Sequence, residues 1–410
     1  MENTRTAIEI AEPKKERLAY IDNAKAIAIM IVVIYHCVLC KLEFGFTSKV
    51  ASTLIYWEWN ITNMLSFFLP FFFFATGLTY TPGKKTVKEN IISRLKYLLV
   101  PSLLFYAMCT VPEIITRMID GTDFLTTLKR PLIELLYWNN QFPVEVPAMD
   151  IFFGDFGLWL SSLELGTFWY VQTLIIASLA FYPLAELLRK DRSRHYHIWR
   201  GLTILGLIFL AGIKQYLIND IPLPFSIDKA PFALLIMLVA LWLKDIKIYS
   251  IKSVWGNIVL SLACLALVIV AGGLASGQNN HCWGNYGNAP YFSLIMIYIN
   301  NIAGSILWLQ IGKLIALIKN KAITKAFEFV GKKTFAVFAF HMCIGTTIFW
   351  IIEHFLGQSI TDALPMWGAL LVCVGDAIVS VALSYPLGAL LERIVKAIFK
   401  KDKLKQQTNQ

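Results

Sequence analysis

Ten apolar stretches, each close to the length of a membrane-spanning helix, constrain the fold of this chain more than any other feature. A helix needs about 20 mostly apolar residues to cross a bilayer. The stretches cover residues 23–41, 61–80, 97–117, 166–188, 200–218, 231–246, 254–275, 290–312, 334–355 and 366–391. Of the 410 residues only 16% are charged, against about 25% in an average soluble domain. The sequence therefore predicts an all-α, polytopic membrane bundle of about ten transmembrane helices.

The basic residues indicate how the bundle is oriented. With a cytoplasmic N-terminus, 29 of the 37 Lys and Arg residues lie in or beside inner segments, and cytoplasmic loops are the ones that carry such an excess. We therefore expect both termini in the cytoplasm, with an N-terminal segment 1–21, a membrane domain 22–398 and a basic tail 399–410. No cleavable signal peptide is expected, because residues 1–21 contain no apolar run. The net charge of +10 is then explained by the topology and does not indicate binding of nucleic acid. Membrane lipids remain as expected partners.

Asp22, Lys25 and His36 lie on one face of the first predicted span. At 100° and 1.5 Å per residue, Lys25 and His36 are about 20° apart around the helix axis and roughly 16 Å apart along it. Ionisable groups inside a membrane are costly and usually functional, and neutral imidazole is a common general base. The pattern predicts a catalytic site that includes His36 and Asp22. Asp22 and Lys25, near the inner boundary, belong to the same site or form an ordinary interfacial ion pair.

Two further sets of polar residues enter predicted spans. Arg94 and Lys96 precede the third span at its inner end, where two fixed cations suit a phosphorylated ligand or simply flank the span. His341 lies eight residues after Lys333 in an apolar span. It is predicted to pair with another span or to contact an acceptor molecule.

Residues 118–165 form a long outer segment that is both aromatic and acidic. We expect short interfacial or re-entrant pieces here, since such backbone is tolerated where protein covers it. Aromatic faces beside carboxylates suit a sugar, and Trp138 and Glu164 are the candidate contacts; an interfacial aromatic belt is the alternative. Trp169 and Tyr170, just beyond this segment, are expected at the outer interface.

Other motifs favour structure over chemistry. The run FFLPFFFFATGLTY, 67–80, predicts a packing surface in which Gly77 permits close approach of another helix. The seven cysteines contain no CxxC pair, so neither a disulfide framework nor a metal site is expected.

Five motifs, taken together and in order, resemble the integral-membrane acyltransferase family 3, in the branch similar to fucose 4-O-acetylases. They are DNAKAIAIMIVVIYH in 22–36, FFLPFFFFATG in 67–77, RLKYLLVP in 94–101, FWYV in 168–171 and GKKTFAVFAFH in 331–341. Lys25, where many members have arginine, is the residue that resembles the fucose 4-O-acetylase-like branch. The chain departs from the family pattern at Lys96, since the third-span motif is often richer in arginine. It departs again at Phe338 and Phe340, where the family usually has tyrosine and leucine close before the ninth-span histidine.

The resemblance implies an O-acyltransferase of the bacterial cytoplasmic membrane that acts on an envelope glycan. It implies acetyl-CoA as the cytoplasmic donor, with no metal. His36 matches the essential first-span histidine of the family, and Arg94 matches the third-span basic motif. No esterase-like domain follows the tenth span, so transfer is expected to finish within the membrane domain.

The spacing of these residues suggests how the donor would bind. If Lys25, Arg94 and Lys96 hold the phosphates of CoA at the inner face, the pantetheine arm must cover roughly the 16 Å that separate Lys25 from His36. His36 would then deprotonate a sugar hydroxyl or accept the acyl group transiently. The acceptor, a sugar on a lipid or polysaccharide, would arrive from the outer half of the membrane, with Glu164, Trp138 and His341 as its contacts.

Two other functional classes fit parts of the pattern. A secondary transporter of a sugar or a lipid-linked substrate would explain ten spans with intramembrane histidine. Such folds usually contain paired repeats with Gly- or Pro-interrupted spans, and no such repeat is evident. A non-enzymatic scaffold would leave the Lys25–His36 stripe without a purpose. The oligomeric state cannot be inferred from the sequence.

Overall fold

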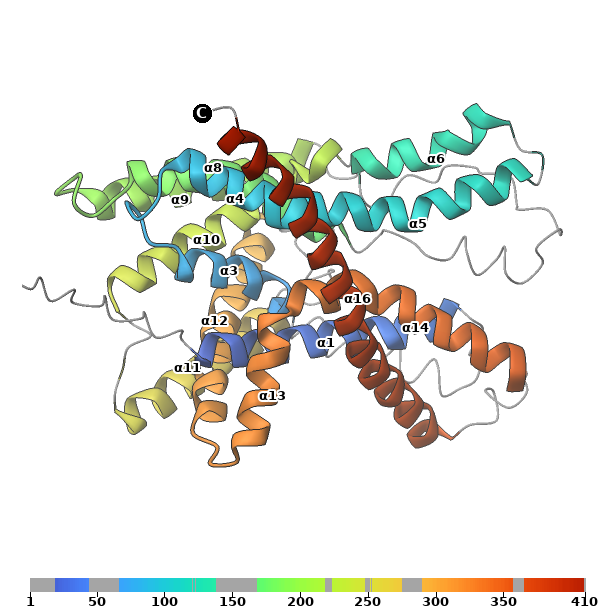
Figure 1. The fold of residues 1–410 in the computed structure, drawn as a ribbon. Coiled ribbons are helices and arrows are strands. Elements are labelled where there is room, and N and C mark those ends of the chain that lie inside the picture. The colour runs from blue at the N-terminus through green and yellow to red at the C-terminus, as the bar shows by residue number, and fades with distance from the viewer. Residues whose placement is uncertain are drawn as a thin grey trace, which may run out of the picture.

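The computed structural model describes residues 19–43, 66–119, 121, 123–137, 168–217, 223–247, 251, 253–274, 290–356 and 365–408. Almost all of these residues lie in helices, and none of them forms a β-strand (Figure 1). The predicted all-α fold is confirmed.

Eight of the ten predicted spans correspond to helices that are long and apolar enough to cross a membrane. These are α1 (Ala19–Glu43), the continuous α4–η2–α5 (Val87–Arg94, Leu95–Leu99, Val100–Ile119), α8 (Trp169–Leu187), α9 (Tyr196–Leu217), η4–α10 (Pro224–Ser226, Ala230–Asp245), α11 (Val254–Leu274), α12 (Pro290–Ala316) and α16 (Met366–Thr408). The remaining two predicted spans match α3 (Pro70–Thr79) and α14 (Thr334–Leu356), whose apolar described parts are shorter. The chain is thus a polytopic membrane bundle.

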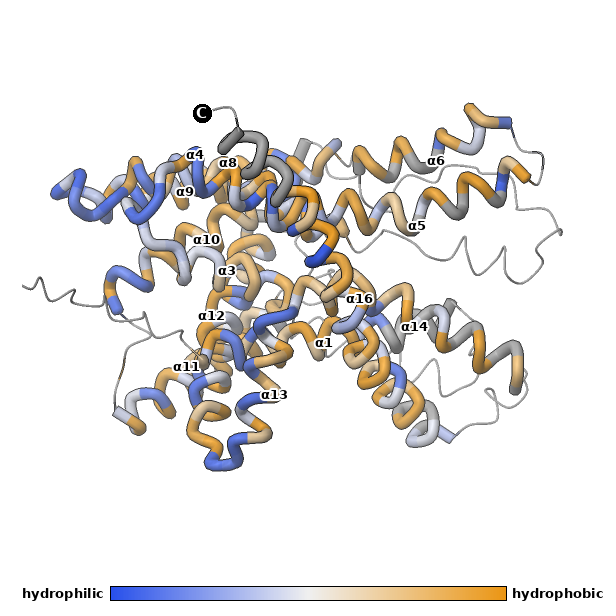
Figure 2. Tube along the Cα trace, viewed as in Figure 1, coloured by the Kyte–Doolittle hydropathy of each residue, from blue (hydrophilic) through white to orange (hydrophobic). Residues whose placement is uncertain are grey.

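The hydropathy of the surface fits this environment. Figure 2 shows hydrophobic residues along the lengths of α5 and α11, while hydrophilic residues gather at turns such as the α8–α9 loop and the α12–α13 turn. Large apolar side chains of α11, including Val259, Leu262 and Val270, are exposed. Exposed apolar surface of this extent suits contact with lipid.

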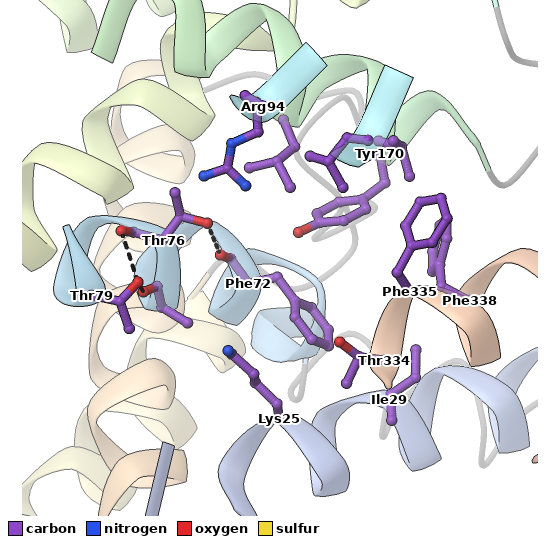
Figure 3. Close-up of a pocket in the computed structure, with 14 residues that line it drawn as sticks. Lys25, Ile29, Phe72, Thr76, Thr79, Arg94, Tyr170, Thr334, Phe335 and Phe338 are labelled. Atoms are coloured by element: carbon purple, nitrogen blue, oxygen red, sulfur yellow. Dashed lines mark hydrogen bonds between the residues drawn. The ribbon is translucent and has the colours of Figure 1, made fainter. Parts of the chain in front are cut away.

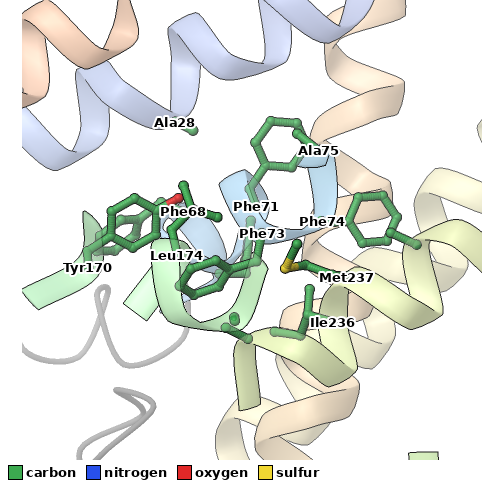
Figure 4. Close-up of a cluster of buried hydrophobic side chains, with 14 of the residues drawn as sticks. Ala28, Phe68, Phe71, Phe73, Phe74, Ala75, Tyr170, Leu174, Ile236 and Met237 are labelled. Carbon is green, nitrogen blue, oxygen red and sulfur yellow. The ribbon is translucent and has the colours of Figure 1, made fainter. Parts of the chain in front are cut away.

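The middle of the bundle is built around the phenylalanine-rich α3 (Figure 4). Pro70 begins this helix, where its fixed φ and missing N–H cost nothing. The rings of Phe71, Phe73 and Phe74 are almost fully buried. A side chain at Gly77 would collide with the backbone carbonyl of Met237 on α10. The predicted packing surface and the close approach at Gly77 are both confirmed.

Two glycines let α1 pack tightly at one end of the bundle, the end that holds Lys25, Arg94 and Gly331 and is called the inner end below. A Cβ at Gly331 would collide with the carbonyl oxygen of Asp22, and a Cβ at Gly312 with that of Tyr20. The side-chain amide of Asn23 donates to the Gly312 carbonyl (3.2 Å). Gly331 belongs to α13 (Lys321–Lys332), a short amphipathic helix that the sequence did not predict.

Ion pairs and hydrogen bonds join the ends of successive helices at the inner end. Arg200 of α9 pairs with Asp245 of α10 (2.6 Å), and Lys333, just before α14, pairs with Glu392 of α16 (2.6 Å). These contacts are consistent with spans that alternate in direction. Which end faces the cytoplasm stays a prediction.

At the opposite end, α6 (Phe124–Tyr137) accounts for the first part of the predicted outer segment. The side-chain amide of Gln172 on α8 donates to the carbonyl of Leu136 (3.1 Å) and accepts from the hydroxyl of Ser226 in η4 (2.8 Å). Residues 138–165, the rest of that segment, lie outside the described residues, so its re-entrant character stays a prediction. At the C-terminus, α16 continues through the expected domain boundary after residue 398 to Thr408.

Candidate active site

A cavity of about 240 Å³ lies near the inner end of the bundle, between α1, α3, α4–η2, α8 and α14 (Figure 3). These helices come from distant parts of the sequence, and each of them carries one of the five motifs that support the family resemblance. Lys25, Thr76, Arg94, Tyr170 and Phe338 are among the lining residues. The cavity is therefore the place where the quoted motifs meet.

Two cations point into this cavity from opposite sides, Lys25 from α1 and Arg94 from the end of α4 (Figure 3). The Lys25 ammonium lies 3.8 Å from a carboxylate oxygen of Asp22, a long ion pair. The Arg94 Nε donates to the hydroxyl of Tyr182 on α8 (3.0 Å). None of the ion pairs found among the described residues involves Arg94. The cavity thus carries positive charge that an anionic ligand can neutralise.

The turn η2 places Arg94 and Leu98 on the cavity and Lys96 elsewhere. It is a π-helical turn over Leu95–Leu99, in which the N–H of Val100 donates to the carbonyl of Leu95. Such turns are rare and often mark functional sites. The Lys96 ammonium lies 4.0 Å from the centre of the Phe399 ring on α16. Of the three predicted donor cations, Lys25 and Arg94 come together and Lys96 lies apart from them.

Glu186 anchors the α3–α4 loop, and with it the helix that carries Arg94. Its carboxylate accepts from the Tyr80 hydroxyl (2.8 Å), the Gly83 N–H (2.7 Å) and the Arg189 guanidinium (3.2 Å). Gly83 has a φ of +78°, which favours glycine. Arg189 also donates to Asp191 and holds the pKa of that exposed carboxyl below its usual value. Sequence reasoning did not identify this anchor.

His36 and His341 lie side by side, their ring centroids 5.2 Å apart. His341 is almost fully buried, and its Nδ1 lies 3.0 and 2.9 Å from the carbonyl oxygens of Val337 and Phe338. Because a carbonyl only accepts hydrogen bonds, Nδ1 must carry the proton, and the neutral ring keeps a lone pair on Nε2. No described group bonds to Nε2. The fold therefore fixes the His341 tautomer that can accept a proton.

Phe338 connects the cavity with the two histidines. Its ring centroid is 5.5 Å from that of Tyr170, which also lines the cavity, and 5.9 Å from that of His341. Phe338 and then His341 therefore form a series of ring contacts that leads from the cavity to His36. Tyr170 was expected at the outer interface, and that expectation is wrong: its side chain is only 5% exposed.

The other predicted site residues lie as follows. Asp22 is buried beside Lys25 and, fourteen residues from His36, is roughly 21 Å from it along the helix. Trp138 and Glu164 lie outside the described residues. Thr76 and Thr79 line the cavity and were not predicted. The two threonines are three residues apart, a spacing that places them on one face of a helix, and this was the sequence signal that could have identified them.

Comparison with known proteins identifies a family that covers most of the chain. The family model of an acyltransferase domain, acyltransferase family 3, matches residues 18–385. No curated protein and no solved structure matches the chain. The matched range begins just before α1, ends within α16, and includes both histidines and every residue that lines the cavity.

Proposed function

Since the chain belongs to acyltransferase family 3, and is thereby a membrane acyltransferase, we propose that it transfers the acetyl group of acetyl-CoA to a sugar hydroxyl of an envelope glycan. One observation carries this proposal: two cations from separate helices share a cavity whose aromatic wall leads to a pair of histidines. A secondary transporter, the alternative considered above, would not require this combination of cations, aromatic wall and paired histidines. The family match also favours acyl transfer.

The cation-lined cavity would hold the donor. Phosphate groups of CoA would contact Arg94, which can make two parallel hydrogen bonds, and Lys25, which acts as a point charge. The pantetheine arm would then follow α1 toward His36, over the roughly 16 Å that separate Lys25 from His36. Phe72, Phe335 and Phe338 provide apolar walls along the cavity. Asp22 would position Lys25, with no contact to the reacting atoms.

His36 would carry the transfer at the outer end of this path. As a general base it takes the proton of the sugar hydroxyl, whose oxygen bonds to the thioester carbon while the carbon–sulfur bond breaks. The thiolate of CoA then recovers the proton from His36 and leaves as the thiol. In the alternative route, His36 attacks the thioester carbon, the carbon–sulfur bond breaks, and CoA leaves as the thiol with the imidazole proton. The sugar hydroxyl then attacks the acetyl carbon, the carbon–nitrogen bond breaks, and the imidazole takes up the hydroxyl proton. In both routes the lone pair of His341 Nε2 would orient the reacting groups.

The acceptor is expected to arrive from the outer half of the bacterial cytoplasmic membrane, carried on a lipid or a growing polysaccharide. Trp138 and Glu164 remain the predicted acceptor contacts. If they only bind acceptor, truncating both should raise the KM for acceptor and leave donor affinity unchanged. An unchanged acceptor KM would remove them from the site.

The test of the proposed function uses vesicles from cells that express the chain, with radiolabelled acetyl-CoA on the cytoplasmic side. Label should enter glycolipid or polysaccharide, and should not do so with His36→Ala. An acetyl-pantetheine thioester that lacks the nucleotide should be a much poorer donor. Equal use of both thioesters would show that the phosphates are not recognised, and sugar uptake without labelled product would support a transporter.

A further inference from the structure

A second cavity, of about 290 Å³, lies beside the first, between η2–α5, the α13–α14 junction and α16. Its walls are apolar. Pro101, Ala336, Leu391 and Val395 line it and are all buried. Gly388 permits this shape, because a side chain there would collide with Ala336 where α14 and α16 cross.

The mouth of the second cavity is basic. Lys332, Lys333 and Lys396 line it together with a single acidic residue, Glu392. Glu392 is shared, since Lys333 lies 2.6 Å from one of its oxygens and Lys396 lies 3.8 Å from the other. Within the described residues, Lys332 pairs with Glu328 of its own helix (3.0 Å). Three lysines therefore face two carboxylates, and this leaves an excess of positive charge.

Two neighbouring side chains extend this basic mouth toward the membrane. Tyr97 lines the cavity and is 61% exposed, a position suited to the interface between lipid tails and headgroups. The Lys96 ammonium lies 5.9 Å from the centre of the Tyr97 ring. Lys96 therefore lies on the side of η2 that faces the second cavity, whereas Arg94 lines the first.

We propose that this second cavity binds an anionic phospholipid, with its phosphate at Lys332 and Lys396 and the upper part of one acyl chain against the apolar wall. Basic pockets between membrane helices suit such headgroups. A free phosphate would make no use of the buried apolar wall, and a zwitterionic lipid would not match the excess positive charge. This site is separate from the proposed acyl transfer.

Phe335 links the second cavity to the first. Its side chain lines both cavities, so it forms part of the wall between them. A lipid chain packed against one side of this ring limits the positions that the ring can take on the other. Bound lipid should therefore support the shape of the donor cavity without contacting the donor.

The experiment measures lipid retained by the full chain, purified in detergent, after addition of phosphatidylglycerol or phosphatidylcholine, by native mass spectrometry. Phosphatidylglycerol should remain bound and phosphatidylcholine should not. Replacing Lys332 and Lys396 by Ala should weaken phosphatidylglycerol binding about 30-fold, at about 1 kcal/mol per lysine. The matched control replaces Lys321 and Lys325, exposed lysines of the same helix α13, and should bind as the unchanged protein does.

Four outcomes would overturn the proposal: no retained phosphatidylglycerol, equal retention of both lipids, an equal loss in the control, or displacement of the lipid by acetyl-CoA in competition. Melting temperatures of both double variants confirm that they are folded. If the Lys332 and Lys396 double variant is unfolded, the single Lys396→Glu variant replaces it, because this side chain is 76% exposed. Undiminished lipid retention by that variant would likewise refute the site.

Discussion

The imidazole rings of His36 and His341 lie 5.2 Å apart, although α1 and α14 are separated by most of the chain. Their proximity depends on how α1 is held, because its first turns pack on α13, directly before α14. The two rings are not equivalent. His341 is fixed by its own helix backbone, while His36 is half-buried.

The first prediction separates the two histidines. His36→Ala should lower transfer by about 10²–10⁴-fold, the usual cost of losing a general base, with little effect on donor affinity. His341→Asn keeps a donor near the Nδ1 position and removes Nε2, so the protein should keep its melting temperature and lose much of its activity. Turnover and thermal melting of both variants provide the check. Near-normal turnover of His36→Ala would shift the catalytic role to His341.

The second prediction concerns the donor cations. Arg94→Ala should weaken CoA binding by about tenfold or more, since a hydrogen bond to a charged group contributes about 1.5–3 kcal/mol. Arg94→Lys should recover only part of this, because an ammonium cannot make a bidentate contact. Tyr182→Phe, which removes the partner of Arg94 Nε, should have a smaller effect. Titration calorimetry with CoA measures all three.

The control for the donor cations is Arg192→Ala, an arginine in the exposed α8–α9 loop. It should leave CoA affinity unchanged. If it weakened binding as much as Arg94→Ala, general attraction to the basic face would explain the effect, and the cavity would lose its assignment.

The third prediction tests the packing that positions Lys25. In Gly331→Ala the new methyl group must displace the Asp22 carbonyl, so the variant should be destabilised by about 1–3 kcal/mol and should bind CoA less tightly. Gly375→Ala is the matched control, because in the described part of the chain no other helix or loop comes within 4 Å of a methyl group added there. Thermal melting compares the two. Equal melting temperatures would mean that α1 tolerates a shift at this contact.

The fourth prediction is the orientation of the bundle. On a cysteine-free background, a cysteine at Ser193 should react with an impermeant reagent only in permeabilised cells. A cysteine at Asp123, in the exposed turn before α6, should react in intact cells. The reverse pattern would place the donor cavity on the outer side and contradict cytoplasmic acetyl-CoA as the donor.

Much of the architecture could be predicted from the sequence because crossing a bilayer leaves few options. Apolar runs of the required length must be helices, and all ten predicted spans have a helical counterpart. The amphipathic α13 was missed because it does not span and its twelve residues carry a mixed pattern. Its role depends on Gly331 meeting Asp22, a long-range contact with no local signal.

The candidate site was predictable in part. Lys25, Arg94 and His36 were found because ionisable groups beside or within apolar runs stand out. Tyr170 was misplaced because an aromatic residue near the predicted end of a span resembles an interfacial one, whereas its ring packs against Phe73 and Phe338 inside the bundle. Lys96 could have been separated from Arg94 by spacing alone, because residues two apart lie about 200° apart around a helix.

The π-helical turn η2 allows a change of chain length beside the site. A single π-helical turn holds about one residue more than an α-helical turn, because its hydrogen bonds join residues five apart instead of four. Deleting one residue from Leu95–Leu99 would therefore let α4 and α5 run on as a regular α-helix while Arg94 stays close to its present place relative to Pro101. In an alignment of homologous chains, a single gap within Leu95–Leu99 would then mark a protein that lacks the π-helical turn and still directs its arginine into the cavity.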